Sequence, residues 1–151
     1  MSRLVLVVEK ASDWGSYYPS DNVVTAMDYL KQPIGGEDEE RTQVINLCRT
    51  YKYLGVGYYV SLLAEARGHK PLPSVITVQD LKTRSVSRLI PDEVDELIQQ
   101  NLAPLTSDEF TLSVYFGRNF AKRHERLALH LFNLFPVPLM KFEFSKRDDK
   151  W

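Results

Sequence analysis

The sequence has a single cysteine, Cys48, among its 151 residues. One cysteine cannot form an internal disulfide, and it lacks the companion ligands that a structural zinc site requires. A reducing, cytoplasmic location is therefore the simplest interpretation. No apolar run is long enough to cross a bilayer. The apolar run Leu4–Val8 is also too short for a secretory signal, so we expect it to form a central strand that is covered on both faces.

The sequence also has no excess of positive charge: it contains 19 lysines and arginines and 20 acidic residues, which gives a formal net charge of -1. This balance argues against a protein that binds nucleic acid through bulk electrostatic attraction. No Gly-x-Ser-x-Gly motif provides a serine nucleophile. His124 and His130 stand six positions apart, which does not place them on one helix face. We expect neither catalytic residues nor a metal site in this chain.

The chain does contain alternating strand and helix patterns. Apolar β-branched runs and later apolar–polar alternation predict strands at residues 4–8, 43–48, 74–77, 110–116 and 140–144. Helical spacing and capping residues predict helices at residues 22–31, 57–67, 77–81, 91–102 and 118–132. Proline, glycine and acidic residues predict an exposed turn at residues 33–40. The interleaving predicts an α/β fold: a three-layer sandwich with a mostly parallel central sheet of about five strands and a mixed or antiparallel edge.

The most informative segment runs from Asn46 to His69 and combines a buried strand, a tyrosine-rich polar loop and a helix. The turn from a strand into a helix is the usual place for a ligand in an α/β protein. Gly55-Val-Gly57 lacks the third small residue of a dinucleotide-binding fingerprint, because Val60 occupies that place. The start of the helix is still suited to hold an anion through its free N–H groups.

Side chains that suit an acidic ligand crowd this turn. An arginine grips a carboxylate at two points, and tyrosines supply flat apolar area with a hydroxyl group. We therefore expect the turn to be an open, electropositive mouth. The candidate residues for binding a substrate or anion are Arg49, Tyr51, Tyr53, Gly55, Gly57 and Tyr58. The alternative interpretation is ordinary loop packing with one solvated arginine, and Cys48 is expected to be a small buried apolar residue.

A second candidate surface is a basic stripe on the last predicted helix, formed by Arg118, Lys122, Arg123 and Arg126. Such a stripe is either a solvated helix face or a docking surface for an acidic partner domain. The last strand, near Met140, has one polar side and is expected at a sheet edge. Both features leave open whether the protein forms a homodimer.

Several stretches resemble the RimK-like ATP-grasp N-terminal domain family: Asn46–Leu54, Gly57–His69 and Leu72–Val75, with Phe116-Gly117 and Leu134–Met140 compatible with it. The likeness covers most of the chain. The resemblance implies a place just ahead of an ATP-grasp catalytic module. Such modules join a carboxylate to an amine through an acyl phosphate with ATP and magnesium, and RimK-type members ligate amino acids such as glutamate to peptide or protein ends.

We therefore expect residues 1–145 to form a single α/β domain and residues 146–151 to begin a linker toward that module, with Trp151 as the anchor of a further element. ATP and magnesium belong to the module and no cofactor to this chain, which should be inactive alone. The leading hypothesis is an accessory domain that positions an acidic small molecule or peptide. The alternatives are a protein-interaction or dimerisation module and a stand-alone nucleotide-binding protein. The sequence does not identify the ligated amino acid.

Overall fold

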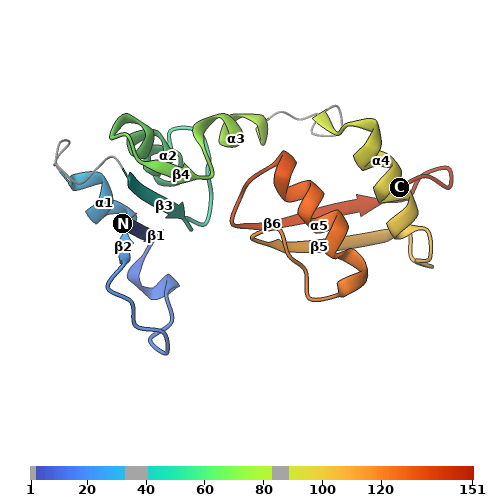
Figure 1. Cartoon of the computed structure of the whole chain (residues 1–151), viewed down its shortest axis with the longest axis horizontal. Helices are drawn as coiled ribbons and strands as arrows, with labels where there is room; N and C mark the ends of the chain where they lie inside the picture. The colour runs from blue at the N-terminus through green and yellow to red at the C-terminus, as the bar shows by residue number, and fades with distance from the viewer. Residues whose placement is uncertain (1–2, 33–40, 83–88) are drawn as a thin grey trace. The chain divides into compact units, whose positions relative to one another are not determined.

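The computed structural model describes residues 3–32, 41–82 and 89–151 (Figure 1). The exposed turn predicted at residues 33–40 lies outside the described residues. The chain divides into two compact units, residues 1–79 and residues 80–151, and each is described by itself. The predicted domain limits at residues 1–145 stay a prediction. In the parts of the chain that the structure describes, no helix is long and apolar enough to cross a bilayer.

The first unit contains a parallel four-stranded sheet in the order β2-β1-β3-β4. The strands are β1 (Arg3–Val8), β2 (Val23–Thr25), β3 (Thr42–Asn46) and β4 (Lys70–Leu72). In the described residues, a short 3-10 helix, η1 (Ala11–Asp13), and three α-helices accompany them: α1 (Ala26–Lys31), α2 (Val56–Ala66) and α3 (Val75–Asp80). The two apolar strands predicted from the sequence, β1 and β3, are the two central strands of the sheet. This position is expected because central strands of a parallel sheet are the most buried and are rich in apolar residues.

One face of this sheet forms the main core of the first unit together with α1 and α2. The buried residues of this core are Val5, Val7, Ala26, Tyr29, Val44, Cys48, Val60 and Ala64. The opposite face is less covered than the sequence predicts, because Leu4 is 40% exposed and Leu6 is only half-buried. The prediction that β1 is covered on both faces is therefore wrong at Leu4, near the start of the strand.

Arg67, the residue at the end of α2, connects α2 to α1. Its guanidinium donates hydrogen bonds to the carbonyl oxygens of Tyr29 (2.8 Å), Leu30 (3.3 Å) and Gln32 (2.5 Å). The guanidinium also lies 4.8 Å from the ring centroid of Tyr29. Carbonyl groups at a helix C-terminus lack intrahelical partners and attract a cation. The buried Arg67 therefore caps α1 in addition to ending its own helix.

The prediction for residues 70–81 is partly wrong. The strand lies at Lys70–Leu72, and the stretch predicted as a strand begins helix α3 at Val75. The Ser74 hydroxyl accepts a hydrogen bond from the backbone N–H of Thr77 (3.2 Å). A serine in that place caps the start of a helix, so α3 begins earlier than the predicted capping motif at Thr77.

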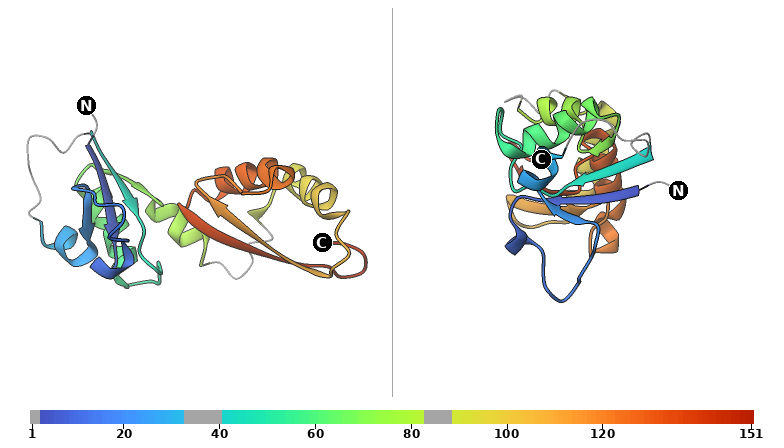
Figure 2. Two further views of the ribbon diagram at one scale, coloured as in Figure 1. Left: turned by 90° about the horizontal axis from the view of Figure 1, so that it is seen from below. Right: turned by 90° about the vertical axis from the view of Figure 1, so that its left-hand side faces the viewer.

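The second unit contains the antiparallel strands β5 (Glu109–Tyr115) and β6 (Leu139–Ser145) with helices α4 (Asp92–Leu102) and α5 (Lys122–Leu134). Every second residue of the strands is apolar, and these residues pack with α4 and α5, which lie on one side of the sheet (Figure 2). The buried residues of this core are Val94, Ile98, Leu102, Leu112, Val114, Leu127, Ala128 and Leu131. The other side of the sheet carries the polar residues of the alternation.

The predicted α/β class is confirmed. Helices accompany a parallel four-stranded sheet and a small antiparallel sheet, in broad agreement with the predicted three-layer sandwich. The antiparallel strands pair with each other in a sheet of their own, so they do not extend the edge of the parallel sheet.

Candidate functional site

The order of the strands creates a switch point between β1 and β3. From β1 the chain continues to β2 on one side, and it then returns to form β3 on the other side of β1. Val7 is the register partner of Asn46, and the Leu47 N–H donates to the Val7 carbonyl (2.8 Å). The loops that follow β1 and β3 therefore begin side by side. In open α/β sheets, ligands bind outside the carboxyl ends of strands at such a point.

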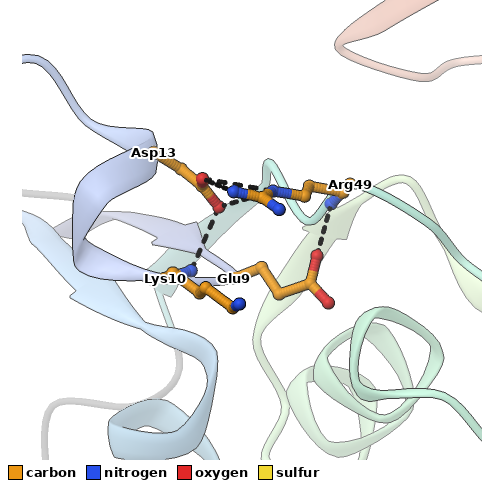
Figure 3. A network of polar contacts seen from close by, with 4 residues as sticks. All are labelled: Glu9, Lys10, Asp13 and Arg49. Carbon is orange, nitrogen blue, oxygen red and sulfur yellow. Dashed lines mark hydrogen bonds and ion pairs between the residues drawn. The ribbon is translucent and has the colours of Figure 1, made fainter.

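Arg49 and Asp13 join these two loops (Figure 3). The Asp13 carboxylate accepts hydrogen bonds from Nε and Nη2 of Arg49, and it also accepts one from the Lys10 backbone N–H (3.1 Å). The Glu9 carboxylate accepts a hydrogen bond from the backbone N–H of Arg49 (3.3 Å). Glu9 and Asp13 thus fix both the backbone and the side chain of Arg49.

Acidic and basic side chains lie together around Arg49. The hydrogen bond from Arg49 holds the pKa of the Asp13 carboxyl below its usual value, and the hydrogen bond to Asp13 raises the pKa of Arg49. Two carboxylates, Glu9 and Asp13, accompany the cations Lys10 and Arg49. Lys52 in the second loop adds a third cation. The electropositive mouth stays a prediction, and it was made without the two acids of the first loop, which the sequence of the second loop alone does not reveal.

The turn is nevertheless open at Arg49. Its side chain is 58% exposed, whereas that of Asp13 is 17% exposed. An arginine carries five N–H donors in a planar fork. Asp13 engages the Nε side of the fork, and within the described residues nothing binds Nη1 of Arg49. The free end of the guanidinium is available for a carboxylate or phosphate.

The three predicted tyrosines occupy different environments. Tyr51 is half-buried, its hydroxyl donates to the Asn46 carbonyl (2.7 Å), and burial raises its pKa. Tyr58 is 8% exposed and packs with Val75 and Val78. Tyr53 is 61% exposed, and its ring centroid lies 5.4 Å from that of Tyr58. Of the three, Tyr53 presents the most surface, while Tyr51 and Tyr58 support the turn from inside.

A buried asparagine at the end of β3, Asn46, holds the turn in place. Its amide nitrogen donates to the Gly57 carbonyl (2.8 Å) and the Ser61 hydroxyl (3.0 Å), and its amide oxygen accepts from the Cys48 N–H (3.2 Å). Ser61 in turn donates to the Pro73 carbonyl (2.7 Å). A buried polar group without partners is costly, whereas this fully bonded one specifies a single arrangement. Asn46 therefore ties β3 to the loop and to α2.

The two predicted glycines allow α2 to begin close to the loop. Gly55 is the N-cap of α2, and a Cβ at Gly57 would lie 2.1 Å from the Thr50 carbonyl oxygen and 3.0 Å from the Cys48 Cβ. Helix geometry leaves the first backbone N–H groups of α2 without intrahelical partners. Cys48 is buried as predicted, and desolvation, followed by the charges of Glu9 and Asp13, raises its pKa to about 12. Its thiol is therefore protonated at neutral pH and unsuited to nucleophilic attack.

The comparison with protein families gives a match to the RimK-like ATP-grasp N-terminal domain over residues 26–151. The chain belongs to this family. Searches of curated proteins and of solved structures each returned no match. The resemblance seen in the sequence is thereby confirmed, and the family description implies a RimK-like ATP-grasp module in the same protein. Arg49 lies within the matched region of this RimK-like domain, whereas Glu9 and Asp13 precede it.

The predicted docking residues of the RimK-like domain lie in its second unit. Arg118 has a side chain that is 80% exposed and forms an ion pair with Glu125 (3.4 Å). The helix begins at Lys122, so the prediction that Arg118 is helical is wrong: it lies in the turn after Gly117, whose φ is +80°. Lys122, Arg123 and Arg126 are exposed on α5. Within the described parts of the chain, no group of three acidic, histidine or cysteine side chains is arranged to hold a metal ion.

Two residues of the site, Glu9 and Asp13, were not predicted as functional from the sequence. Both follow an apolar strand directly or within a few residues, and that strand was correctly predicted. Parallel neighbouring strands bring their carboxyl-end loops together. The acids after β1 could have been assigned to the site from the sequence only if the pairing of β1 with β3 had been known. The sequence alone does not give this strand order.

The glycines offer a direct test of the packing of the turn. Replacement of Gly57 by alanine should lower the free energy of unfolding by about 2 to 3 kcal/mol, because the added Cβ has no space. The matched change Gly15→Ala has no atom within 4 Å of the added Cβ and should alter it by about 0.5 kcal/mol or less. Urea denaturation followed by circular dichroism measures both. Equal stability of the two variants would show that Gly57 is not closely packed.

Proposed function

We propose that this chain is the non-catalytic, substrate-positioning N-terminal domain of a RimK-like ATP-dependent carboxylate–amine ligase. The observation that carries this proposal is the oriented, exposed guanidinium of Arg49 at the switch point of a domain that belongs to this family. The substrate would be an amino acid or a peptide that bears a carboxylate. A cytoplasmic location accords with the single buried Cys48.

Each group of the turn would have a separate role in binding the substrate. Asp13 orients the guanidinium of Arg49, whose free end donates hydrogen bonds to the substrate carboxylate in a two-point contact. Tyr53 supplies an exposed aromatic surface beside the turn for the apolar part of the substrate. The start of α2, which packs on Cys48 and Thr50, adds backbone N–H donors near the same loop.

The chemical step belongs to the ATP-grasp module that the family implies. ATP and magnesium would bind there, and activation of the carboxylate as an acyl phosphate would occur there. This chain would hold and orient the substrate and would be inactive alone. Variants of this domain would therefore change the KM for the carboxylate substrate more than they change the reaction of ATP.

Replacement of Arg49 by alanine in the protein that includes the ATP-grasp module tests the proposal. Loss of a charge-assisted contact should raise the KM for the carboxylate substrate by about tenfold or more. Arg49→Lys should recover only part of this affinity, because an ammonium lacks the planar fork. Arg41→Ala removes another exposed arginine of the first unit and serves as the control. Unchanged KM and turnover in Arg49→Ala would remove the proposed role.

A second candidate function, docking of a partner domain, is favoured by an exposed group of aromatic and basic residues at the turn between β5 and α5. Phe120 is 92% exposed, and its ring centroid lies 5.3 Å from that of Tyr115. Phe116 is 48% exposed and has a φ of +49°, a conformation that is uncommon for a bulky residue. Arg118 lies in the same turn, and Lys122 is the first residue of α5. Exposed apolar residues that are gathered in this way mark interaction surfaces.

Charge reversal separates this function from substrate positioning. The double variant Arg118→Glu with Lys122→Glu should weaken binding of an acidic ATP-grasp module to this domain by about tenfold or more, as measured by calorimetry between the separately expressed parts. Lys31→Glu, an exposed change in the first unit, is the matched control. The Arg49 variants should leave this affinity unchanged. Equal affinities of the charge-reversed and control variants would exclude this surface from docking.

A further inference from the structure

The strand β6 is the less covered of the two strands in the second unit. On β5 the inward residues Leu112 and Val114 are each 1% exposed, whereas the inward residues of β6 are only half-buried. These residues of β6 are Met140, Phe142 and Phe144. A cavity of about 500 Å³ borders β6, and its lining includes residues 142–145 but no residue of the described strand β5. Apolar surface of the unit is therefore open beside β6, on the side away from β5.

The outer edge of β6 presents backbone groups that bond to nothing among the described residues. Tyr115 of β5 exchanges backbone hydrogen bonds with Arg118 (2.9 Å each), so its N–H and carbonyl point away from its register partner, Leu139. Bonded and non-bonded pairs alternate along two antiparallel strands. Every second residue from Leu139 to Ser145 therefore directs its N–H and carbonyl to the outer edge, where no hydrogen bond to the described residues satisfies them.

The outer edge of β5, in contrast, is partly closed by the turn that follows it. Arg118 bonds the backbone groups of Tyr115, and Nδ2 of Asn119 donates to the Ser113 carbonyl (2.7 Å). The pairing of β6 with β5 runs over Leu139–Ser145 without a bulge, and this stretch contains no proline. Bulges and prolines are two of the features that keep an edge strand from pairing. Of the two edges, that of β6 is thus the one suited to another strand.

Two opposite charges on the outer face of β6 decide which strand fits this edge. Lys141 and Glu143 are exposed, and neither forms an ion pair with a described residue. Their register partners on β5 are Ser113 and Thr111, which carry no charge. A charge at an edge keeps away a strand of like charge, but it favours a strand that places the opposite charge across from it. A basic and an acidic residue two positions apart meet this condition in a second copy of β6.

We propose that two copies of this chain pair antiparallel through β6, so that their two-stranded sheets join into one sheet of four strands. The two-fold axis passes at Phe142, and Lys141 of each copy lies opposite Glu143 of the other. The backbone groups at the two outer edges then face each other, as antiparallel bonding requires. On the apolar face, Met140 lies opposite Phe144 of the other copy, which covers the half-buried side chains. Registers centred on Lys141 or on Glu143 place like charges opposite each other, which is unfavourable.

Sedimentation velocity over a series of protein concentrations tests this pairing. The intact chain should show a concentration-dependent dimer. Lys141→Glu and Glu143→Lys each place like charges opposite each other at two symmetric positions, and each should raise the dissociation constant of the dimer by about tenfold or more. The double variant exchanges the two charges, restores both opposite pairs and should dimerise as the intact chain does. The matched control is Glu109→Lys, an exposed change on the outer face of β5, and it should leave the dimer intact.

A mixture of the two single variants identifies the register, because each variant supplies the charge that the other lacks. The mixture should form a heterodimer, although each variant alone is mostly monomeric, and circular dichroism verifies that both remain folded. An intact chain that stays monomeric at every concentration would overturn the proposal, whether another strand or none occupies the edge. A dimer that neither charge reversal weakens, or a double variant that stays monomeric, would overturn it as well. These outcomes do not bear on Arg49, whose test is the KM of the longer enzyme.

Discussion

The parallel pairing of β1 with β3 is the constraint on which the proposed site depends. The register from Arg3↔Thr42 to Val7↔Asn46 brings together two loops that are distant in the sequence. Only this pairing places Asp13 beside Arg49 and Glu9 beside the backbone of Arg49. A strand shifted by one residue would turn its apolar side chains to the other face, so the buried valines of both strands hold the register.

The turn after β3 contains buried residues that fix its conformation and exposed residues that are available to a ligand. Asn46, Tyr51 and Gly57 are directed inward, and their hydrogen bonds and close packing fix the path of the chain from β3 into α2. Arg49 and Tyr53 are directed outward on that rigid support. A binding group that is held in this way loses little conformational entropy when a ligand arrives, which favours affinity. The ion pair with Asp13 contributes orientation more than stability, because exposed ion pairs are worth little.

The sequence predicted the elements with strong patterns and missed those decided by tertiary contacts. The apolar run Leu4–Val8 and the helical spacing of α2 are local signals, and both predictions agree with the structure. Residues 74–77 are rich in β-branched side chains, which predicts a strand, but the Ser74 cap favours a helix. The strand lies before them and contains Pro71, which is tolerated because β4 is an edge strand that pairs only with β3. Arg49 was found from its neighbours, whereas its partner Asp13 belongs to a loop that only the strand order identifies.

The pKa of the Asp13 carboxyl tests the pairing of the two loops most directly. NMR titration measures this pKa in the intact chain and in the variant Arg49→Ala. The arrangement predicts a pKa below the ordinary value of 3.8 in the intact chain, with the hydrogen bond from Arg49 as the main cause. Removal of the guanidinium should raise this pKa toward the ordinary value. An Asp13 that titrates at its ordinary pKa in the intact chain, unaffected by the loss of Arg49, would show that β1 and β3 do not bring the two loops together.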